Sequence, residues 1–151
     1  MKKTVVALIL FFALAQFTYA QDNIVIGDAW VRGVPPGSSV SAAYMTIENK
    51  GEEDDRLTGM SSDVAESAEL HISKVSEDGI STMEMIKTLD IPSGKTAQLK
   101  PGGMHVMLIG LKESFAGKKY VTLNMHFEKS GVIKIEIPVK SPVGGGGMHH
   151  H

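Results

Sequence analysis

The sequence predicts an all-β fold, a single domain built as a sandwich or barrel. Most of the chain consists of short segments in which apolar and polar residues alternate, as they do in half-buried strands. Glycine and proline, which number 16 and 6, separate these segments. Only one short stretch, 111–115, has the pattern of a helical turn. Many short strands and almost no helix are typical of a β-sandwich or barrel.

The expected strands follow one another from residue 24 to residue 139. The first, 24–31, ends before the turn Pro35-Pro36-Gly37. Segments 67–75 and 80–88 flank Ser76-Glu77-Asp78-Gly79, whose Asp-Gly pair is typical of a hairpin turn. The remaining strands are expected at 43–48, 96–100, 105–109, 120–127 and 132–139. The sequence contains no internal repeat.

The first twenty residues are predicted to be a cleaved signal peptide that exports the protein to the periplasm. Lys2 and Lys3 give a positive start, and 5–15 is apolar. Small residues at the −3 and −1 positions of Thr18-Tyr19-Ala20 indicate cleavage before Gln21. The apolar run is shorter than the roughly 20 residues that a membrane span requires. Because the chain has no cysteine, no acceptor for a lipid follows this segment.

The remaining chain has the length of one domain, which we place at 21–140 and follow with a flexible tail at 141–151. Without the two lysines of the signal, 13 basic side chains face 17 acidic ones, a net charge of −4. A mildly acidic chain with no basic cluster gives no electrostatic reason to bind nucleic acid or anionic lipid. Zero cysteines exclude disulfides, so the core alone must stabilise the domain, which we expect to be a monomer.

Four residues in the pattern His-x11-Met-x21-His-x-Met form the main functional candidate: His71, Met83, His105 and Met107. Two imidazoles and two thioethers make a soft, uncharged donor set that suits Cu(I) better than zinc, magnesium or calcium. A donor set without thiols also avoids disulfide formation in an oxidising compartment. The sequence therefore predicts a copper(I) site.

Strand geometry allows these side chains to meet. His105 and Met107 are two residues apart on one expected strand, so they share a face. Met83 and Met85 likewise share a face on the hairpin strand that follows His71, and this geometry does not choose between them. The turn before His105 would place the site near one end of the barrel, where a metal could enter and leave.

Other functional classes lack the residues that they need. Blue-copper electron transfer and thiol-disulfide chemistry require cysteine, and the chain has none. No serine lies in a Gly-x-Ser-x-Gly elbow. A copper oxidase or dismutase would need three or more histidines at its metal, and outside the tail there are only three in total. We therefore expect no enzymatic activity, and an interaction domain without metal is the remaining alternative.

The spacing of His71, Met83, His105 and Met107 fits the motif H(M)-x10-M-x21-H-x-M. This is the motif of the periplasmic copper chaperone family PCu(A)C, and the chain resembles that family. The resemblance spans roughly 24–139. It departs from the motif at Ile72, where the family often has methionine. Further similar stretches are Trp30-Val31-Arg32, Ala43-Tyr44, Ala68-Glu69-Leu70-His71 and Pro101-Gly102-Gly103-Met104-His105.

This resemblance implies a cupredoxin-like Greek-key fold that binds one Cu(I) through two His and two Met. It favours Met83 over Met85 as the ligand. It also implies delivery of copper toward the CuA centre of cytochrome c oxidase, with a copper-accepting oxidase subunit or a Sco-type thiol protein as partner. Copper buffering or resistance in the periplasm is the alternative role, and a copper redox protein is a weaker one.

The tail ends in four potential copper donors, Met148, His149, His150 and His151, behind four glycines. Glycine-rich segments act as flexible tethers, and imidazoles accept Cu(II) readily. We interpret the tail as a native auxiliary copper collector, a feature that the resemblance supports. The alternative is a remnant of a purification tag, although three histidines are fewer than such a tag normally has.

Overall fold

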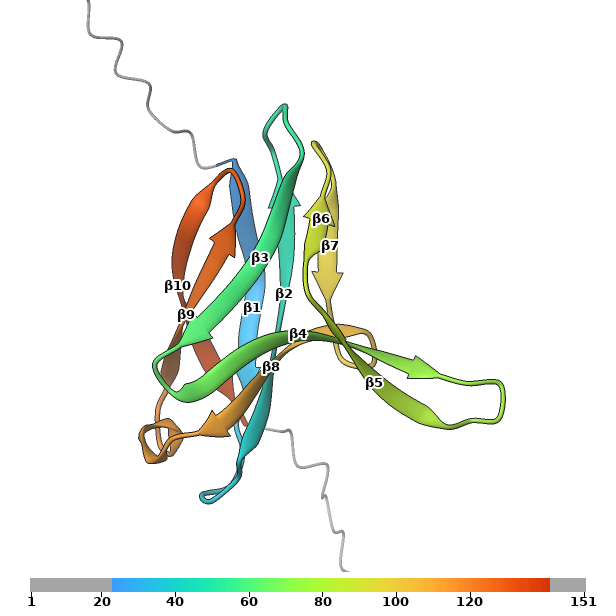
Figure 1. The fold of residues 1–151 in the computed structure, drawn as a ribbon. Coiled ribbons are helices and arrows are strands. Elements are labelled where there is room, and N and C mark those ends of the chain that lie inside the picture. The colour runs from blue at the N-terminus through green and yellow to red at the C-terminus, as the bar shows by residue number, and fades with distance from the viewer. Residues whose placement is uncertain (1–22, 142–151) are drawn as a thin grey trace, which may run out of the picture.

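A computed structural model describes residues 23–141 of the 151-residue chain, with ten β-strands and one short 3-10 turn (Figure 1). The predicted signal peptide and the donors of the tail lie outside the described residues and stay predictions. The 3-10 turn, Glu113–Phe115, falls in the segment predicted to be helical. The strands are β1 (Ile24–Arg32), β2 (Val40–Asn49), β3 (Asp55–Ser62), β4 (Ala65–Val75), β5 (Ser81–Ile86), β6 (Leu89–Ile91), β7 (Thr96–Leu99), β8 (Met104–Leu111), β9 (Tyr120–Phe127) and β10 (Gly131–Lys140).

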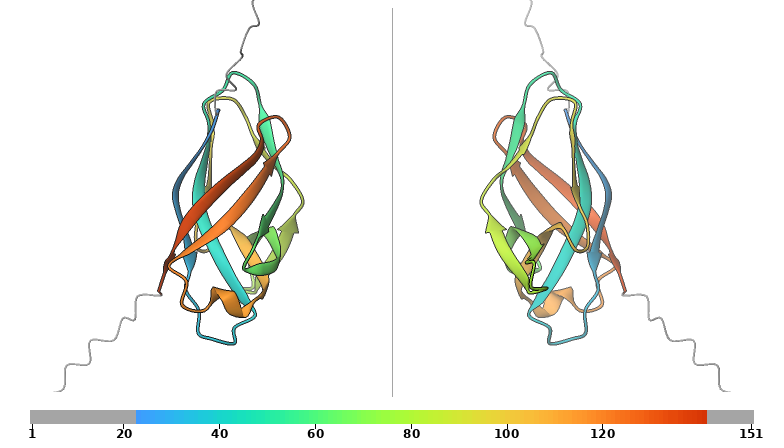
Figure 2. Two further views of the ribbon diagram at one scale, coloured as in Figure 1. Left: turned by 90° about the vertical axis from the view of Figure 1, so that its left-hand side faces the viewer. Right: turned by 90° about the vertical axis from the view of Figure 1, so that its right-hand side faces the viewer.

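Seven of the strands close into a barrel, so the predicted all-β barrel is confirmed. They run in the order β4-β8-β2-β1-β10-β9-β3, and the pair Met60 and Ala68 joins β3 back to β4. β1 and β10 are parallel and the other neighbours antiparallel. β5 extends the sheet beyond β4, β6 pairs with β3, and β7 pairs with β2. Figure 2 shows the barrel from two sides, with β1, β2, β9 and β10 crossing around a common interior.

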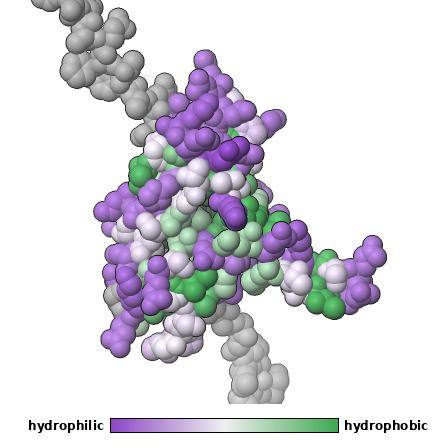
Figure 3. Space-filling model, in the orientation of Figure 1, coloured by the Kyte–Doolittle hydropathy of each residue, from purple (hydrophilic) through white to green (hydrophobic). Residues whose placement is uncertain are grey.

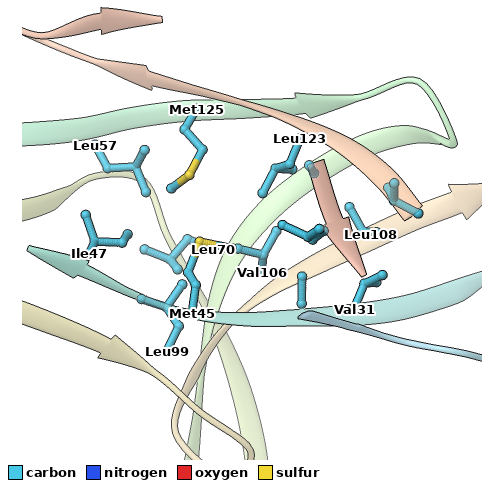
Figure 4. Packing of buried hydrophobic residues seen from close by; sticks show 14 of the residues in the cluster. Val31, Met45, Ile47, Leu57, Leu70, Leu99, Val106, Leu108, Leu123 and Met125 are labelled. Atoms are coloured by element: carbon cyan, nitrogen blue, oxygen red, sulfur yellow. The ribbon is translucent and has the colours of Figure 1, made fainter. Parts of the chain in front are cut away.

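The interior of the barrel is filled by side chains from one face of each strand (Figure 4). On β9 the buried residues alternate strictly with half-exposed ones, as the period of a strand requires. Met45 and Met125 are fully buried in this cluster, where their side chains pack against other apolar residues. Each fully buried apolar side chain contributes about 1.5–3 kcal/mol relative to an exposed one. The core thus stabilises a domain that has no disulfide.

Two strands, β3 and β6, were not predicted. β3 contains Gly59 and ends in two serines, so its sequence alternates poorly. A register shift between Leu57 and Gly59 marks a bulge, which further interrupts the alternation. β3 is a strand because β9 lies along one side of it and β6 along the other. Its neighbours, which are distant in the sequence, therefore decide its conformation.

The hairpin β4–β5 extends away from the barrel as an arm (Figure 1). Its turn, predicted from the Asp-Gly pair, closes with hydrogen bonds between Ser76 and Ile80 and between Gly79 and Ser76, and Gly79 has φ of +78°. The Lys74 ammonium hydrogen-bonds Glu84 across the two strands, which holds the pKa of that carboxyl below its ordinary value. Figure 3 shows apolar surface on this arm between hydrophilic regions. The exposed apolar residues of the arm are Val75, Ile80, Met83 and Met85.

Candidate metal site on the outer face of the barrel

The two histidines of the motif lie directly opposite each other on neighbouring strands. His71 on β4 pairs with His105 on β8, and the centroids of the two rings are 6.3 Å apart with their planes inclined by 30°. Their chain neighbours Leu70 and Val106 point into the core. Because successive residues of a strand point to opposite faces, both imidazoles lie on the outer face of the barrel.

The methionines of the motif occupy the same face around His71. Met107 is paired with Glu69, and Met83 with Ser73, each two residues from His71 along β4. Diagonal neighbours of this kind are about 7–8 Å apart, within reach of a long side chain. Met85, the alternative to Met83, lies directly opposite His71 on β5. Three neighbouring strands, β8, β4 and β5, thus carry the four motif residues and Met85 on one face.

The hydrogen bonds of His71 leave one of its ring nitrogens without a partner. Nε2 donates to Oε2 of Glu69 at 2.9 Å, which defines the Nε2–H tautomer. Nδ1 is buried and has no hydrogen-bond partner among residues 23–141. A buried polar atom without a partner is costly, typically about 1–3 kcal/mol. Nδ1 therefore carries a lone pair that a metal ion would satisfy.

His105 is oriented by the turn that precedes it. Its Nδ1 donates to the carbonyl oxygen of Gly103 at 3.1 Å, and this leaves Nε2 as the acceptor nitrogen. The same carbonyl accepts the backbone N–H of Ser73 at 3.2 Å, so the turn is also fastened to β4. Gly102 has φ of +82°, a conformation that favours glycine, and it allows the tight return into β8. The Pro-Gly-Gly turn thus sets both the tautomer and the position of His105.

An aromatic row supports His105 from the side away from His71. The ring of Tyr44 on β2 lies 6.4 Å from that of His105 and 4.7 Å from that of Trp30 on β1. The guanidinium of Arg32 donates to the Tyr44 hydroxyl at 3.1 Å. Tyr44 and His105 are only 5% and 6% exposed although they lie on the outer face. The site thus has a buried side on β2 and β8 and an exposed side on the arm.

Trp30 reaches this row through a bulge in β1. The register of β1 against β2 shifts by one residue between Gly27 and Trp30, and Asp28 adopts a positive φ of 50° there. A one-residue bulge moves the following side chains to the opposite face of a sheet. Without it, Trp30 would point into the core together with Ile24 and Ile26.

The donor set fits a soft monovalent metal. The described residues contain no group of three or more His, Asp or Glu side chains placed to hold a metal ion. Sites for zinc, calcium or magnesium are normally built from such groups or from cysteine. Two neutral imidazole nitrogens together with thioethers suit Cu(I). The unpartnered Nδ1 of His71 and the available Nε2 of His105 are consistent with that chemistry.

Three further residues, Met104, Ile72 and His126, lie away from the site. Met104 pairs with Ile72 on the opposite face and packs against the core. Ile72 therefore points away from the site, so its departure from the motif leaves the donor face unchanged. His126 lies on β9 opposite Val132 and Gly59. Glu69 and Tyr44 lie in stretches that resemble the PCu(A)C family, but the sequence did not indicate what either residue does. Glu69 is two residues before His71 on one strand, so the shared face could have predicted that the two side chains meet. The contact of Tyr44 with His105 joins two strands and could be found only in the tertiary structure.

These features define a β-barrel with a candidate metal site on its outer face. The chain belongs to the family whose model is described as "Putative lipoprotein LpqE-like", which matches residues 24–139. This is the PCu(A)C family that the motif predicted, so the resemblance is confirmed. The curated protein "Putative lipoprotein Lxx21020" of Leifsonia xyli subsp. xyli (strain CTCB07) is 32% identical over 120 residues, which are 79% of this chain and 70% of that protein.

Solved structures of the family share the fold, which confirms the cupredoxin-like prediction. The copper-bound PCuAC domain from PmoF2 has a TM-score of 0.67 and 26% identity, over 82% of this chain and 97% of that one. The solution structure of CuI-DR1885 from Deinococcus radiodurans has a TM-score of 0.63 and 30% identity, over 87% of each chain. Among residues 23–141, no helix has the length and apolarity needed to cross a membrane.

Proposed function

We propose that this protein is an exported, non-enzymatic metallochaperone that holds one Cu(I) through His71, Met83, His105 and Met107. The observation that carries the proposal is the directly opposed pair of His71 and His105 with thioethers on the same face of neighbouring strands. The copper-bound relatives support the choice of metal. We assign Nδ1 of His71 and Nε2 of His105 as the binding nitrogens, since the other nitrogen of each ring donates a hydrogen bond.

The chemistry of the donors supports delivery of the copper. Neutral thioethers and imidazoles hold Cu(I) but give little support to Cu(II), so the ion stays in one valence. Thiolates bind Cu(I) more strongly than thioethers, so an acceptor with cysteines can take the ion by ligand exchange. We propose the CuA centre of cytochrome c oxidase as destination, reached directly on the oxidase subunit or through a Sco-type thiol protein.

Export to the periplasm is part of this proposal. The charged start and apolar segment of residues 1–20 support it, and the relatives described as lipoproteins are consistent with it. This chain contains no cysteine, so the lipidated cysteine of a lipoprotein is not among its residues. N-terminal sequencing of protein recovered from the periplasm should give Gln21 as the first residue.

X-ray absorption on the protein loaded with one equivalent of Cu(I) tests the ligand set. We expect mixed nitrogen and sulfur scattering, lost in part when Met107 is replaced by leucine and unchanged when Met104 is replaced by leucine. A shell of nitrogen and oxygen alone would contradict the proposal. Mixing the loaded protein with the apo CuA domain and then adding a one-electron oxidant tests delivery, because transfer of Cu(I) gives the colourless reduced centre and the CuA spectrum develops only on its oxidation. Copper that binds but does not transfer would favour the buffering or resistance role.

A further inference from the structure

Met85 lies closer to the paired histidines than the methionine of the motif does. It is directly opposite His71, whereas Met83 is opposite Ser73. Directly opposed side chains have Cβ atoms about 4.5–5.5 Å apart, and diagonal neighbours about 7–8 Å. The Met85 thioether is therefore at least as well placed as that of Met83 to reach a metal held by His71.

The donors of this face become more exposed from the barrel toward the end of the arm. His105 is 6% exposed, Met85 is 50% exposed and Met83 is 60% exposed. Met83 is the one nearer to the Ser76–Gly79 turn that ends the arm (Figure 1). An acceptor that approaches from the end of the arm therefore meets Met83 before it meets Met85 or His105.

Met85 also has space in which to move. It lines a pocket of about 280 Å³ between β3 and the arm, together with Met60 and Glu69. Methionine has three rotatable bonds and a polarizable sulfur, so its thioether adapts to different positions. The Met85 side chain can thus lie in this pocket or turn toward His71 without a change in the backbone.

We propose that Met85 is an exchange ligand that replaces Met83 during the release of Cu(I), an inference that rests on the proposed function. In this step the bond from copper to the Met83 sulfur breaks and a bond to the Met85 sulfur forms. Copper stays Cu(I), and no electron or proton moves because both thioethers are neutral. His71, His105 and Met107 keep the ion while the exposed Met83 position opens to an acceptor thiolate.

The test compares sulfur scattering in Cu(I)-loaded Met83→Leu, Met85→Leu and the double variant. Both methionines are exposed, so leucine is accommodated at either position. Met104→Leu is the matched control, because Met104 lies on the opposite face. Met83→Leu should keep two sulfur ligands, since Met85 replaces the lost one. The double variant should have one, and Met85→Leu alone should have two.

Affinity and transfer rate give a second readout. Met85→Leu should change the Cu(I) affinity by less than about threefold but slow transfer to dithiothreitol by about tenfold, which corresponds to about 1.4 kcal/mol in the activation free energy. The loss of Cu(I)-binding free energy in the double variant should exceed the sum of the losses in the two single variants.

The outcomes separate this inference from the proposed function. Loss of one sulfur in Met83→Leu itself, with additive affinities, would show that Met85 takes no part in exchange, while the copper site would stand. No sulfur scattering in the unmodified protein would contradict the proposed function and the exchange with it.

Discussion

Glu69 and His71, two residues apart on β4, are joined by a hydrogen bond of 2.9 Å from Nε2 of the imidazole to the carboxylate. The carboxylate fixes the tautomer in which Nδ1 carries the lone pair, and that atom is buried without a partner among the described residues. Partners that orient a metal-binding histidine in this way commonly affect metal affinity.

Glu69→Gln should weaken Cu(I) binding by about 10-fold to 100-fold, because the amide holds the Nε2–H tautomer less firmly. Competition with a Cu(I)-selective chelator measures the affinity, and nitrogen chemical shifts of the imidazole in the apo protein report the tautomer. Glu66→Gln, an exposed glutamate of the same strand, is the control. An unchanged tautomer and affinity in Glu69→Gln would mean that the hydrogen bond is incidental.

Tyr44 should matter through its ring more than through its hydroxyl. Tyr44→Phe removes the bond from Arg32 and should cost about 0.5–1.5 kcal/mol of unfolding free energy, with Cu(I) affinity nearly unchanged. Tyr44→Leu also removes the ring beside His105 and should lower both stability and affinity. Urea unfolding followed by the emission of Trp30, the single tryptophan, measures stability. Tyr120, which is 61% exposed, provides the control Tyr120→Leu. Equal affinities in the two Tyr44 variants would argue against a positioning role for the ring.

Asp55 should make stability depend on pH in the acid range. Burial raises the pKa of this carboxyl, but hydrogen bonds from the Ser130 hydroxyl and from the backbone N–H groups of Lys129, Arg56 and Ser130 outweigh it, so the pKa lies below its ordinary value. A carboxyl with a lowered folded-state pKa stabilises the fold above its unfolded pKa. That contribution is lost as the pH falls through the folded-state value.

Asp55→Asn should therefore cost about 1–3 kcal/mol near neutral pH, because an amide cannot accept all four bonds. The difference from the unmodified protein should shrink as the pH falls through the lowered folded-state pKa of Asp55, where the aspartate itself becomes protonated. Urea unfolding between pH 2 and pH 7 measures it. Asp54→Asn, at an exposed position that accepts one bond from Ser93, is the control. A difference that stays constant with pH would contradict the argument.

Deletion of residues 144–151 should remove a Cu(II) binding event and leave Cu(I) binding at the core site unchanged. The reason is chemical, since three imidazoles accept Cu(II) and the core donors do not favour it. Isothermal titration with Cu(II) and chelator competition with Cu(I) measure the two events. Replacing Met148 and the three histidines by serine keeps the length of the tail and should have the same effect. Full Cu(II) binding by the shortened chain would mean that the tail is no copper collector.

The sequence by itself determined the fold class, most of the strands and the motif residues. Strand alternation has a period of two and hairpin turns have their own chemistry, so the Asp-Gly turn and the shared face of His105 and Met107 could be predicted from nearby residues. The metal preference followed from the donor atoms, which are a property of residue type.

Only the tertiary structure decided which residues lie across from one another. β3 became a strand through pairing with β6 and β9. The bulge before Trp30 placed that ring on the outer face, and the register of β5 placed Met85 opposite His71. Register depends on contacts between segments far apart in the chain, and a shift of one residue reverses every side chain that follows. No local pattern carries that information, so the support of His105 by Tyr44 and the position of Met85 had to be read from the fold.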